Sequence, residues 1–241
     1  MEQSQLGNQL DQSSLAHNRA VLRYGKANRD AYIQAANLME RSLAGPDRNE
    51  LTRLRVAFAV LSANCPFQSS VDALAYVRQV GLANVEESSL ARFQCVPVKA
   101  RACREIASKP IQAFLRQVDE TWQEYRERLA RETLGLGRAK ASFAACLIYP
   151  TRADLACVDT WICKVYLGRD SFKSLSRVDY ERVEGEVRKI RDKIGFPSTF
   201  LAQWCIWNHA RGDKPGQVTF DHSFLSLPGS HKGTESSIPP F

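Results

Sequence analysis

The sequence predicts an all-α fold. Apolar residues recur at the three- and four-residue spacing of a helix along most of the 241 residues, and stretches in which apolar and polar residues alternate, as in a half-buried strand, are absent. Glycine and proline interrupt the helical pattern at places that suit turns between helices. A chain with helical signals alone is expected to bury its core by packing helix on helix.

The N-terminal part of the chain is expected to form a series of helices. The first is predicted over residues 20–43, because Gly45 and Pro46 then end the helical pattern. The second is predicted to begin at Asp47, which forms the pattern of a capping box with Glu50. Further helices are predicted over residues 70–80, 87–93, 99–107 and 111–130.

The C-terminal part continues the helical pattern and ends in a tail. An apolar helix is predicted after Gly137, with Pro150 as its end, and another is predicted to open at Asp159. Two more helices are predicted over residues 179–194 and 197–210. Residues 213–241 are rich in Gly, Ser and Pro, so we expect a tail that is partly disordered or lies along the surface.

Composition narrows the classes of function. Lys and Arg number 33 against 26 Asp and Glu, which gives a net charge of +7 and favours a polyanionic partner. No apolar run approaches the ~20 residues that a membrane helix needs, and the polar first residues do not form a secretory signal. The seven scattered cysteines indicate reduced thiols in a cytosolic protein. The four histidines lack metal-ligand spacing, so no metal or other cofactor is expected.

The segment Leu134–Ala141 holds two glycines, Gly135 and Gly137, between a polar helix and an apolar one. Glycine lets the backbone pass close to an oxygen atom, and the amides at the start of the following helix attract an anion. The segment therefore fits a phosphate-binding turn. Two glycines at this spacing also occur in ordinary helix–helix turns, so the pattern alone leaves both interpretations open.

The triplet Val158-Asp159-Thr160 follows the apolar helix after a short loop. Asp159 fits the N-cap of the next helix, which is a common place for aspartate. A carboxylate in a dry cleft can also stabilise positive charge that develops on a reacting group. The triplet by itself leaves the structural and the catalytic role open.

Taken together, these two segments resemble the helix-hairpin-helix DNA glycosylase superfamily, which includes endonuclease III, the adenine glycosylase that acts opposite oxidised guanine, and the bacterial alkyl-purine glycosylases. That superfamily has a hairpin of the form GhGxxxA, where h is apolar, followed by an aspartate in a V-D-T or V-D-x context. The matching residues here are Gly135, Leu136, Gly137 and Ala141, followed by Val158-Asp159-Thr160.

Weaker likenesses accompany this pair of motifs. Val60-Leu61-Ser62-Ala63-Asn64 is similar to an early segment of endonuclease III relatives, and the family's usual Gln, which enters the DNA stack, falls on Asn64. Lys99-Ala100-Arg101 resembles the helix before the hairpin, and residues 197–207 resemble the terminal helix of the alkyl-purine branch. The resemblance covers most of residues 50–210.

The resemblance implies a base-flipping enzyme that breaks the N-glycosidic bond, with Asp159 as the catalytic carboxylate beside C1′ of the sugar. Bifunctional members form a Schiff base with a lysine at the second position after the hairpin's last glycine, which here is Ala139. Lys140 is one position further, and one step along a helix turns a side chain by ~100°. An ungapped alignment thus implies a monofunctional enzyme, and a gapped one makes Lys140 the nucleophile.

The resemblance also implies DNA contacts and a base pocket. Ala139 and Trp161 are expected to line the pocket for the flipped base, and Asn64 is expected to fill the space that the base leaves. Phosphate contacts are expected at Gly135, Gly137, Arg138, Lys140, Lys99 and Arg101. Only two cysteines follow Asp159, without the clustered spacing of the iron–sulfur loop that some relatives carry.

These inferences predict two helical subdomains with a DNA-binding cleft between them. Residues 46–150 form a helical barrel that contains the hairpin over 134–141. Residues 151–212 form a subdomain that carries the catalytic aspartate, and the N-terminal helix within residues 1–45 packs with it.

The predicted function is that of a monofunctional DNA glycosylase that excises a damaged or modified base and leaves an abasic site. Such an enzyme acts in base-excision repair or in defence against modified phage DNA. The predicted partner is double-stranded DNA, bound by a monomer in the cytoplasm, or at the nucleoid if the protein is bacterial. Two alternatives remain: a bifunctional glycosylase and lyase that uses Lys140, and a non-catalytic hairpin protein that only binds DNA.

Overall fold

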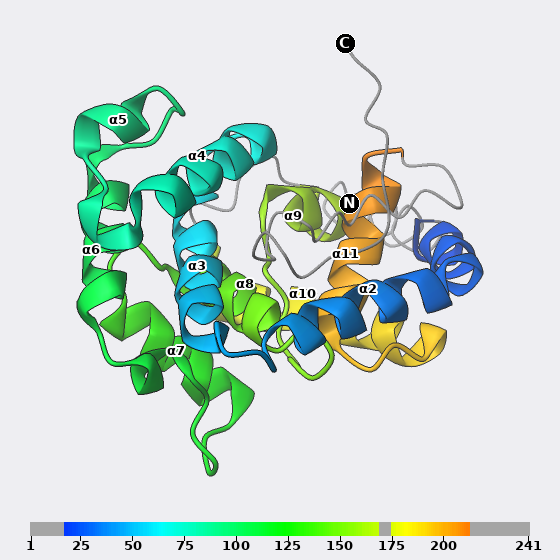
Figure 1. Ribbon diagram of the computed structural model, residues 1–241. Helices are drawn as coiled ribbons and strands as arrows, with labels where there is room; N and C mark the ends of the chain where they lie inside the picture. The colour runs from blue at the N-terminus through cyan, green and yellow to red at the C-terminus, as the bar shows by residue number, and fades with distance from the viewer. Residues whose placement is uncertain (1–16, 169–174, 213–241) are drawn as a thin grey trace, which may run out of the picture.

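The computed structural model describes residues 17–168 and 175–212, and within these ranges it contains helices, turns and loops but no strand. The prediction of an all-α fold is confirmed. The α-helices, labelled as in Figure 1, are α2 (Arg29–Ser42), α3 (Arg48–Leu61), α4 (Phe67–Val80), α5 (Glu87–Ala91), α6 (Pro97–Ser108), α7 (Trp122–Glu132), α8 (Arg138–Ile148), α9 (Thr160–Leu167), α10 (Arg177–Ile194) and α11 (Thr199–Ala210). Two short 3-10 helices, η1 (Leu82–Asn84) and η2 (Ile111–Phe114), and a helical stretch over residues 17–27 accompany them. The predicted tail, 213–241, lies outside the described residues.

Helix α3 lies at the centre of the fold. Apart from Arg53, residues 51–61 are buried, and the helix packs against α4, α6 and α8. Arg55 of α3 is fully buried, and its guanidinium donates to the carbonyls of Met39 at 2.8 Å and Leu147 at 2.7 Å. These bonds stabilise the buried cation and tie α3 to α2 and α8.

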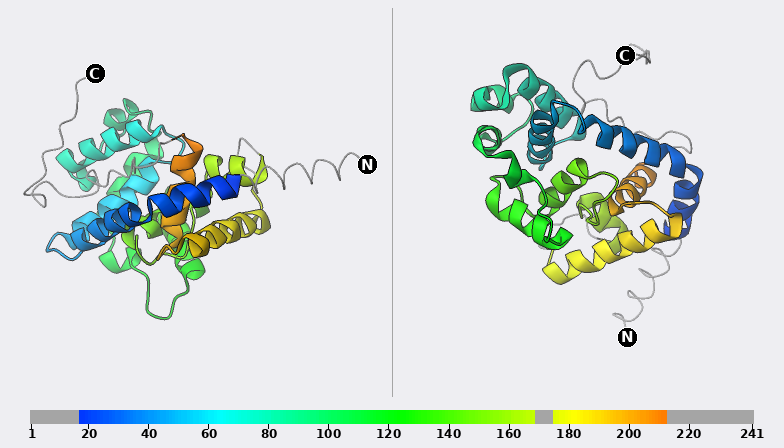
Figure 2. Two further views of the ribbon diagram at one scale, coloured as in Figure 1. Left: turned by 90° about the vertical axis from the view of Figure 1, so that its right-hand side faces the viewer. Right: turned by 60° about the horizontal axis from the view of Figure 1, so that its bottom comes forward.

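The helices form two groups, which are visible in Figure 1 and Figure 2. In one group, α8 packs against both α3 and α7, and α6 packs against α3. In the other, α9 and α10 pack against α11, and α2 joins them through α11. Arg29 at the start of α2 donates to Gly195 O after α10, and Asn208 of α11 donates to the Tyr32 hydroxyl at 2.8 Å. The boundaries of the predicted subdomains stay a prediction.

Two predicted helices are interrupted in the structure. The helix predicted over 20–43 breaks at Asn28, whose side-chain amide donates to Tyr24 O at 2.8 Å and so bonds to the backbone locally. The helix predicted over 111–130 is divided into η2 and α7 by a loop. In both places the prediction followed apolar spacing, which continues across a break that polar side chains stabilise.

The capping box predicted at Asp47 is wrong. Asp47 precedes α3, but its side chain makes no capping hydrogen bond. A capping box forms instead at the start of α7, where Thr121 Oγ1 accepts from Glu124 N at 3.2 Å and Glu124 Oε2 accepts from Thr121 N at 2.8 Å. This box fixes the start of α7 and explains the loop before it.

Candidate active site

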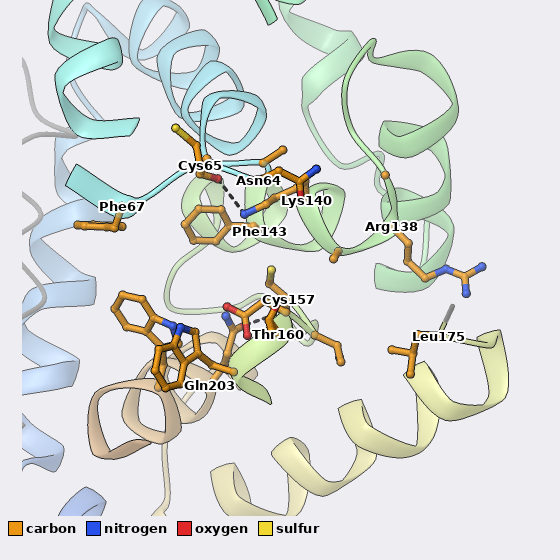
Figure 3. A pocket seen from close by; sticks show the side chains of 18 of the residues that line it. Asn64, Cys65, Phe67, Arg138, Lys140, Phe143, Cys157, Thr160, Leu175 and Gln203 are labelled. Atoms are coloured by element: carbon orange, nitrogen blue, oxygen red, sulfur yellow. Dashed lines mark hydrogen bonds between the residues drawn. The ribbon is translucent and has the colours of Figure 1, made fainter. Parts of the chain in front are cut away.

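A pocket of about 750 Å³ lies where the two groups of helices meet. Figure 3 shows its walls, which come from the loop after α3, the start of α8, the start of α9 and one face of α11. The residues predicted for the site that line the pocket are Asn64, Gly135, Gly137, Arg138, Ala139, Lys140, Asp159 and Trp161. The structure thus brings together most of the residues that the sequence selected.

The hairpin turn requires a backbone conformation that favours glycine. Gly135 has φ = +83°, and a Cβ at this position would lie 3.0 Å from Cγ1 of Val60 in α3. Gly137 is the exposed N-cap of α8 and has no side chain with which to cap the first amides of that helix. Because the helix dipole also favours negative charge at this end, the start of α8 can accept an anion.

Asp159 lies where the chain turns into α9. Its side chain caps that helix, because Oδ1 accepts a hydrogen bond from Ile162 N at 3.0 Å. Burial raises the pKa of the Asp159 carboxyl above its usual value, while backbone amides and the Lys140 ammonium act in the opposite direction. The same side chain therefore caps a helix and places a partly buried carboxylate on the pocket wall.

Lys140 lies across the pocket from the start of α9. Its Nζ donates to Ser62 Oγ at 3.0 Å and lies 5.3 Å from the centroid of the Phe143 ring. Figure 3 shows the amine directed into the pocket, toward the loop after α3. Ala139 lines the same pocket, so the one-residue step between the two positions leaves both side chains on its wall.

Aromatic rings form the inner wall. Trp204 and Trp207 of α11 lie with ring centroids 5.3 Å apart, and Phe143 of α8 is nearly parallel to Trp204, at 15° and 6.5 Å between centroids. Phe67 lies 5.9 Å from Trp207. Such rings can hold a planar base by stacking. No sequence motif marks Phe67 or Phe143, although Phe143 is four residues after Ala139, the spacing that places two side chains on one helix face.

Two further lining residues, Tyr180 of α10 and Gln203 of α11, carry no sequence motif. They bond to backbone groups far away along the chain: Tyr180 OH accepts from Val158 N, 22 positions earlier, and Gln203 Oε1 accepts from Cys157 N, 46 positions earlier. Because any residue type presents an amide, no pattern of side chains marks such a contact.

Lys99 does not fit the phosphate contact that the sequence predicted. Its side chain is 4% exposed, and Nζ donates to Leu61 O at the end of α3 at 2.7 Å and lies 3.8 Å from Cys95 Sγ. The carbonyls at the end of a helix lack partners within it, and a lysine can supply one. Arg101 is exposed on α6 but does not line the pocket, so its phosphate contact stays a prediction. Asn64 is exposed at the pocket, with φ = +51°.

The ionisable side chains limit the chemistry of the pocket. Burial raises the pKa of the Cys157 thiol to about 12, which keeps it protonated and weakly nucleophilic at neutral pH. Arg138 is paired with Glu127 at 3.0 Å.

Among residues 17–168 and 175–212, no three His, Cys, Asp or Glu side chains group as a metal site requires. Over the same described ranges, no helix is both long and apolar enough to cross a membrane.

Comparison with known proteins gives matches of structure and none of sequence. No family profile and no curated protein matches the chain by sequence. The Methanocaldococcus jannaschii 8-oxoguanine glycosylase/lyase, in complex with a 15mer DNA that contains 8-oxoguanine, matches with a TM-score of 0.66 at 18% identity, over 83% of this chain and 99% of that one. The 8-oxoguanine DNA glycosylase of Thermotoga maritima matches with a TM-score of 0.65 at 19% identity, over 85% of this chain and 100% of that one. The predicted resemblance to helix-hairpin-helix glycosylases is thereby confirmed as a resemblance of fold.

Proposed function

We propose that the chain is a DNA glycosylase that hydrolyses the N-glycosidic bond of a base flipped into the pocket and leaves an abasic site. The main support is the carboxyl of Asp159, which lies on the wall of a pocket that also holds the anion-accepting start of α8. The fold shared with crystal structures of 8-oxoguanine glycosylases, one of them bound to DNA, supports the same activity.

The chemistry of bond cleavage explains why a carboxylate suits this place. As the bond to the base breaks, positive charge develops at C1′ of the sugar, and the Asp159 carboxylate stabilises that charge and orients or deprotonates the attacking water. A raised carboxyl pKa brings the basicity of this group closer to the operating pH, which favours proton transfer from water. The products are the free base and an abasic site.

The rest of the pocket suits the binding of an extruded nucleotide. Backbone phosphates bind at the start of α8, near Gly137, Arg138 and Lys140, and Asn64 fills the space that the base leaves. Ala139 and Trp161 line the space that the base enters. All of these groups come from one chain, so the proposed active form is a monomer.

Lys140 supports a second candidate function, in which the enzyme also cuts the DNA strand. Its Nζ lies in the same pocket as Asp159, and an amine there can attack C1′ and form a Schiff base. In the structure Nζ donates to the Ser62 hydroxyl oxygen and lies over the face of the Phe143 ring. These contacts must be broken before the amine can attack C1′, which favours the hydrolytic proposal.

The test uses purified protein and a panel of duplexes that carry 8-oxoguanine, alkylated, deaminated, mismatched and hypermodified bases, together with phage DNA that contains modified cytosines. At least one substrate is expected to be cut after alkali and not before it, and borohydride is expected to trap no adduct. An adduct that disappears in Lys140→Ala would instead identify the lyase. Duplexes that bind but never acquire alkali-labile sites would favour a non-catalytic hairpin protein.

A further inference from the structure

We propose, on the premise of the glycosylase activity above, that Tyr180 positions Asp159 by joining the hairpin helix α8 to the chain segment that leads into Asp159. Tyr180 lies on α10, 4% of its surface is exposed, and it lines the pocket without belonging to any of the motifs that define the hairpin or the aspartate. The evidence is the set of hydrogen bonds that its hydroxyl makes.

The segment that leads into Asp159, residues 153–158, is neither helix nor strand and, apart from Asp154, is buried. The part of the chain that the structure describes has no strand to pair with it, so its backbone groups need other partners. Three consecutive amides donate to three side chains of α10 and α11. The pairs are Ala156 N with Glu184 Oε1 at 2.9 Å, Cys157 N with Gln203 Oε1 at 2.6 Å, and Val158 N with Tyr180 OH at 3.3 Å.

The Tyr180 hydroxyl uses its full hydrogen-bonding capacity. It has one proton, which it donates to Ala156 O at 2.7 Å, and it accepts from Val158 N. Ser142 Oγ lies 3.1 Å away, and because the phenolic proton is already used, the Ser142 hydroxyl must be the donor in this pair. One oxygen atom thus holds the segment on both sides of Cys157 and bonds to α8 as well.

A second contact links the same side chain to the hairpin. The guanidinium of Arg138, the first residue of α8, lies 5.8 Å from the centroid of the Tyr180 ring, and Ser142 follows four residues later on that helix. Tyr180 therefore contacts α8 with both its ring and its hydroxyl. The two contacts are at positions 138 and 142, on either side of Lys140 in the sequence. Tyr180 therefore fixes the distance between the first turns of α8 and Asp159.

Tyr180 differs in this respect from the other two side chains that hold the segment. Gln203 bonds the segment to α11 and Glu184 bonds it to α10, whereas Tyr180 bonds it to α8 through Ser142. The other bond from α8 to the segment, which Cys146 Sγ donates to Leu155 O at 3.2 Å, lies four residues before Asp159. Loss of the Tyr180 hydroxyl should therefore loosen Asp159 relative to α8 while the segment stays attached to the second group of helices. That expectation separates positioning from a general contribution to folding.

The test compares Tyr180→Phe with Tyr125→Phe in the full-length protein. Tyr125 is a matched control, because it is also buried and its hydroxyl also donates to a backbone carbonyl, Phe114 O, at 2.5 Å, away from the pocket. In Tyr180→Phe, single-turnover release of the base from the best duplex of the panel is expected to slow by tenfold or more. Its Kd for that duplex is expected to stay within twofold, because the ring and its contact with Arg138 remain. Tyr125→Phe is expected to keep the wild-type rate.

Amide hydrogen exchange of the free protein reports on the hydrogen bond from Val158 N to the Tyr180 hydroxyl, and it requires no enzymatic activity. Exchange at Val158 is expected to be tenfold or more faster in Tyr180→Phe and unchanged in Tyr125→Phe. A chain that releases no base would overturn the proposed function and leave this measurement to decide on Tyr180. Unchanged exchange at Val158, or a rate of base release within twofold of that of Tyr125→Phe, would overturn the positioning role.

Ser142→Ala tests the hydrogen bond between α8 and the Tyr180 hydroxyl. This variant removes the third bond of the Tyr180 hydroxyl and leaves its two bonds to the segment in place. Base release is expected to slow by severalfold, while exchange at Val158 stays as in the wild type. A wild-type rate in Ser142→Ala would show that Tyr180 holds the segment without linking it to the hairpin helix.

Discussion

The two walls of the pocket obtain their shape in different ways. The hairpin wall, residues 134–143, depends on its own sequence, with Gly135 in the left-handed region and Gly137 at the start of α8. The aspartate wall, residues 153–161, depends on other elements, because side chains of α10 and α11 hold the backbone that leads into Asp159. A substitution far from the pocket can therefore alter the geometry of the aspartate wall more easily than that of the hairpin wall.

The largest effect is expected at the aspartate wall itself. Asp159→Asn keeps the helix cap, because asparagine caps helices about as well as aspartate, but it removes the charge. We expect base release to slow on the order of 10³-fold, with DNA affinity within a few-fold of wild type. Single-turnover cleavage and a binding titration with one duplex measure both quantities. Full activity would remove Asp159 from the mechanism.

The next largest effect concerns the support of that wall. Glu184 and Arg126 form a pair at 3.0 Å with side chains that are each 1% exposed, and Glu184 also accepts from Ala156 N. Glu184→Gln leaves a buried guanidinium without its main counter-charge, so we expect the free energy of unfolding to fall by about 3 kcal/mol. Urea denaturation measures the change.

Glu181→Gln is the control for this prediction. Glu181 is on the same helix and pairs with Arg177 at 2.7 Å, but both side chains are largely exposed. Solvent screens such a pair, and no measurable change in stability is expected. Equal losses in the two variants would show that the buried pair contributes no more than an ion pair on the surface does.

A smaller effect is expected when the hairpin wall is made bulkier. Ala139 leaves space in a pocket of about 750 Å³. Ala139→Trp should fill that space and reduce the release of a bulky modified base by roughly tenfold relative to a small damaged base, because steric selection in a pocket is worth a few kcal/mol at most. Competition between the two substrates in one reaction measures the ratio. An unchanged ratio would mean that neighbours such as Trp161 already occupy the space.

Salt dependence should separate the two lysines. Lys140 lines the pocket, whereas Lys99 is 4% exposed and bonded to Leu61 O. Lys140→Ala is expected to lower the slope of log affinity against log salt by about one and to weaken DNA binding a few-fold, because one phosphate contact is lost. Lys99→Met is expected to leave the slope unchanged. A reduced slope in Lys99→Met would restore the original sequence prediction for that residue.

The smallest effect is a pH dependence of folding at Asp159. Burial raises the pKa of the folded carboxyl above its usual value of 3.8, so the folded chain binds this proton more tightly than the unfolded chain does. Protonation thus contributes stability that is complete below 3.8 and is lost as pH rises through the folded pKa. Asp159→Asn should therefore melt at a higher temperature than the wild type at pH 7.

Thermal denaturation at several pH values measures this difference. The advantage of Asp159→Asn is expected to shrink as the pH falls toward 3.8, where the wild-type carboxyl becomes protonated. A constant difference across the pH range would show that it arises from something other than the ionisation of Asp159. An absence of any difference would mean that the attraction of the Asp159 charge to the start of α9 and to Lys140 offsets the cost of burial, and it would contradict a raised pKa of the folded carboxyl.

The contrast between the walls also explains what the sequence could predict. The hairpin turn and the cap at Asp159 depend on residues within four positions of each other, so their patterns were recognisable. Tyr180 and Gln203 bond to amides 22 and 46 positions away, and no local pattern reports such a contact. Lys99 was misjudged for the same reason, because Leu61 O, which holds it inside the protein, is 38 positions away.

Helix positions followed apolar spacing well, and errors occurred where polar side chains decide a helix end. Asn28 interrupts a predicted helix by bonding to Tyr24 O, and Thr121 starts α7 later than predicted. A capping pattern of two residues is satisfied only when the backbone allows the geometry, which the pair at Thr121 achieves and the pattern at Asp47 does not.

Gly135 has a consequence for how the protein would examine DNA. A Cβ at Gly135 would lie 3.0 Å from Cγ1 of Val60 in α3, so the hairpin turn packs closely against α3, and the chain reaches Asn64 soon after α3 ends. Close packing thus fixes the distance between the hairpin turn, which is proposed to bind a phosphate, and Asn64, which is proposed to fill the space that the base leaves. With that distance fixed, the proposed complex requires the DNA duplex to bend and unstack. DNA sites that bend and unstack most readily, such as a weakened base pair at a lesion, would therefore be bound preferentially, before the protein contacts the base itself.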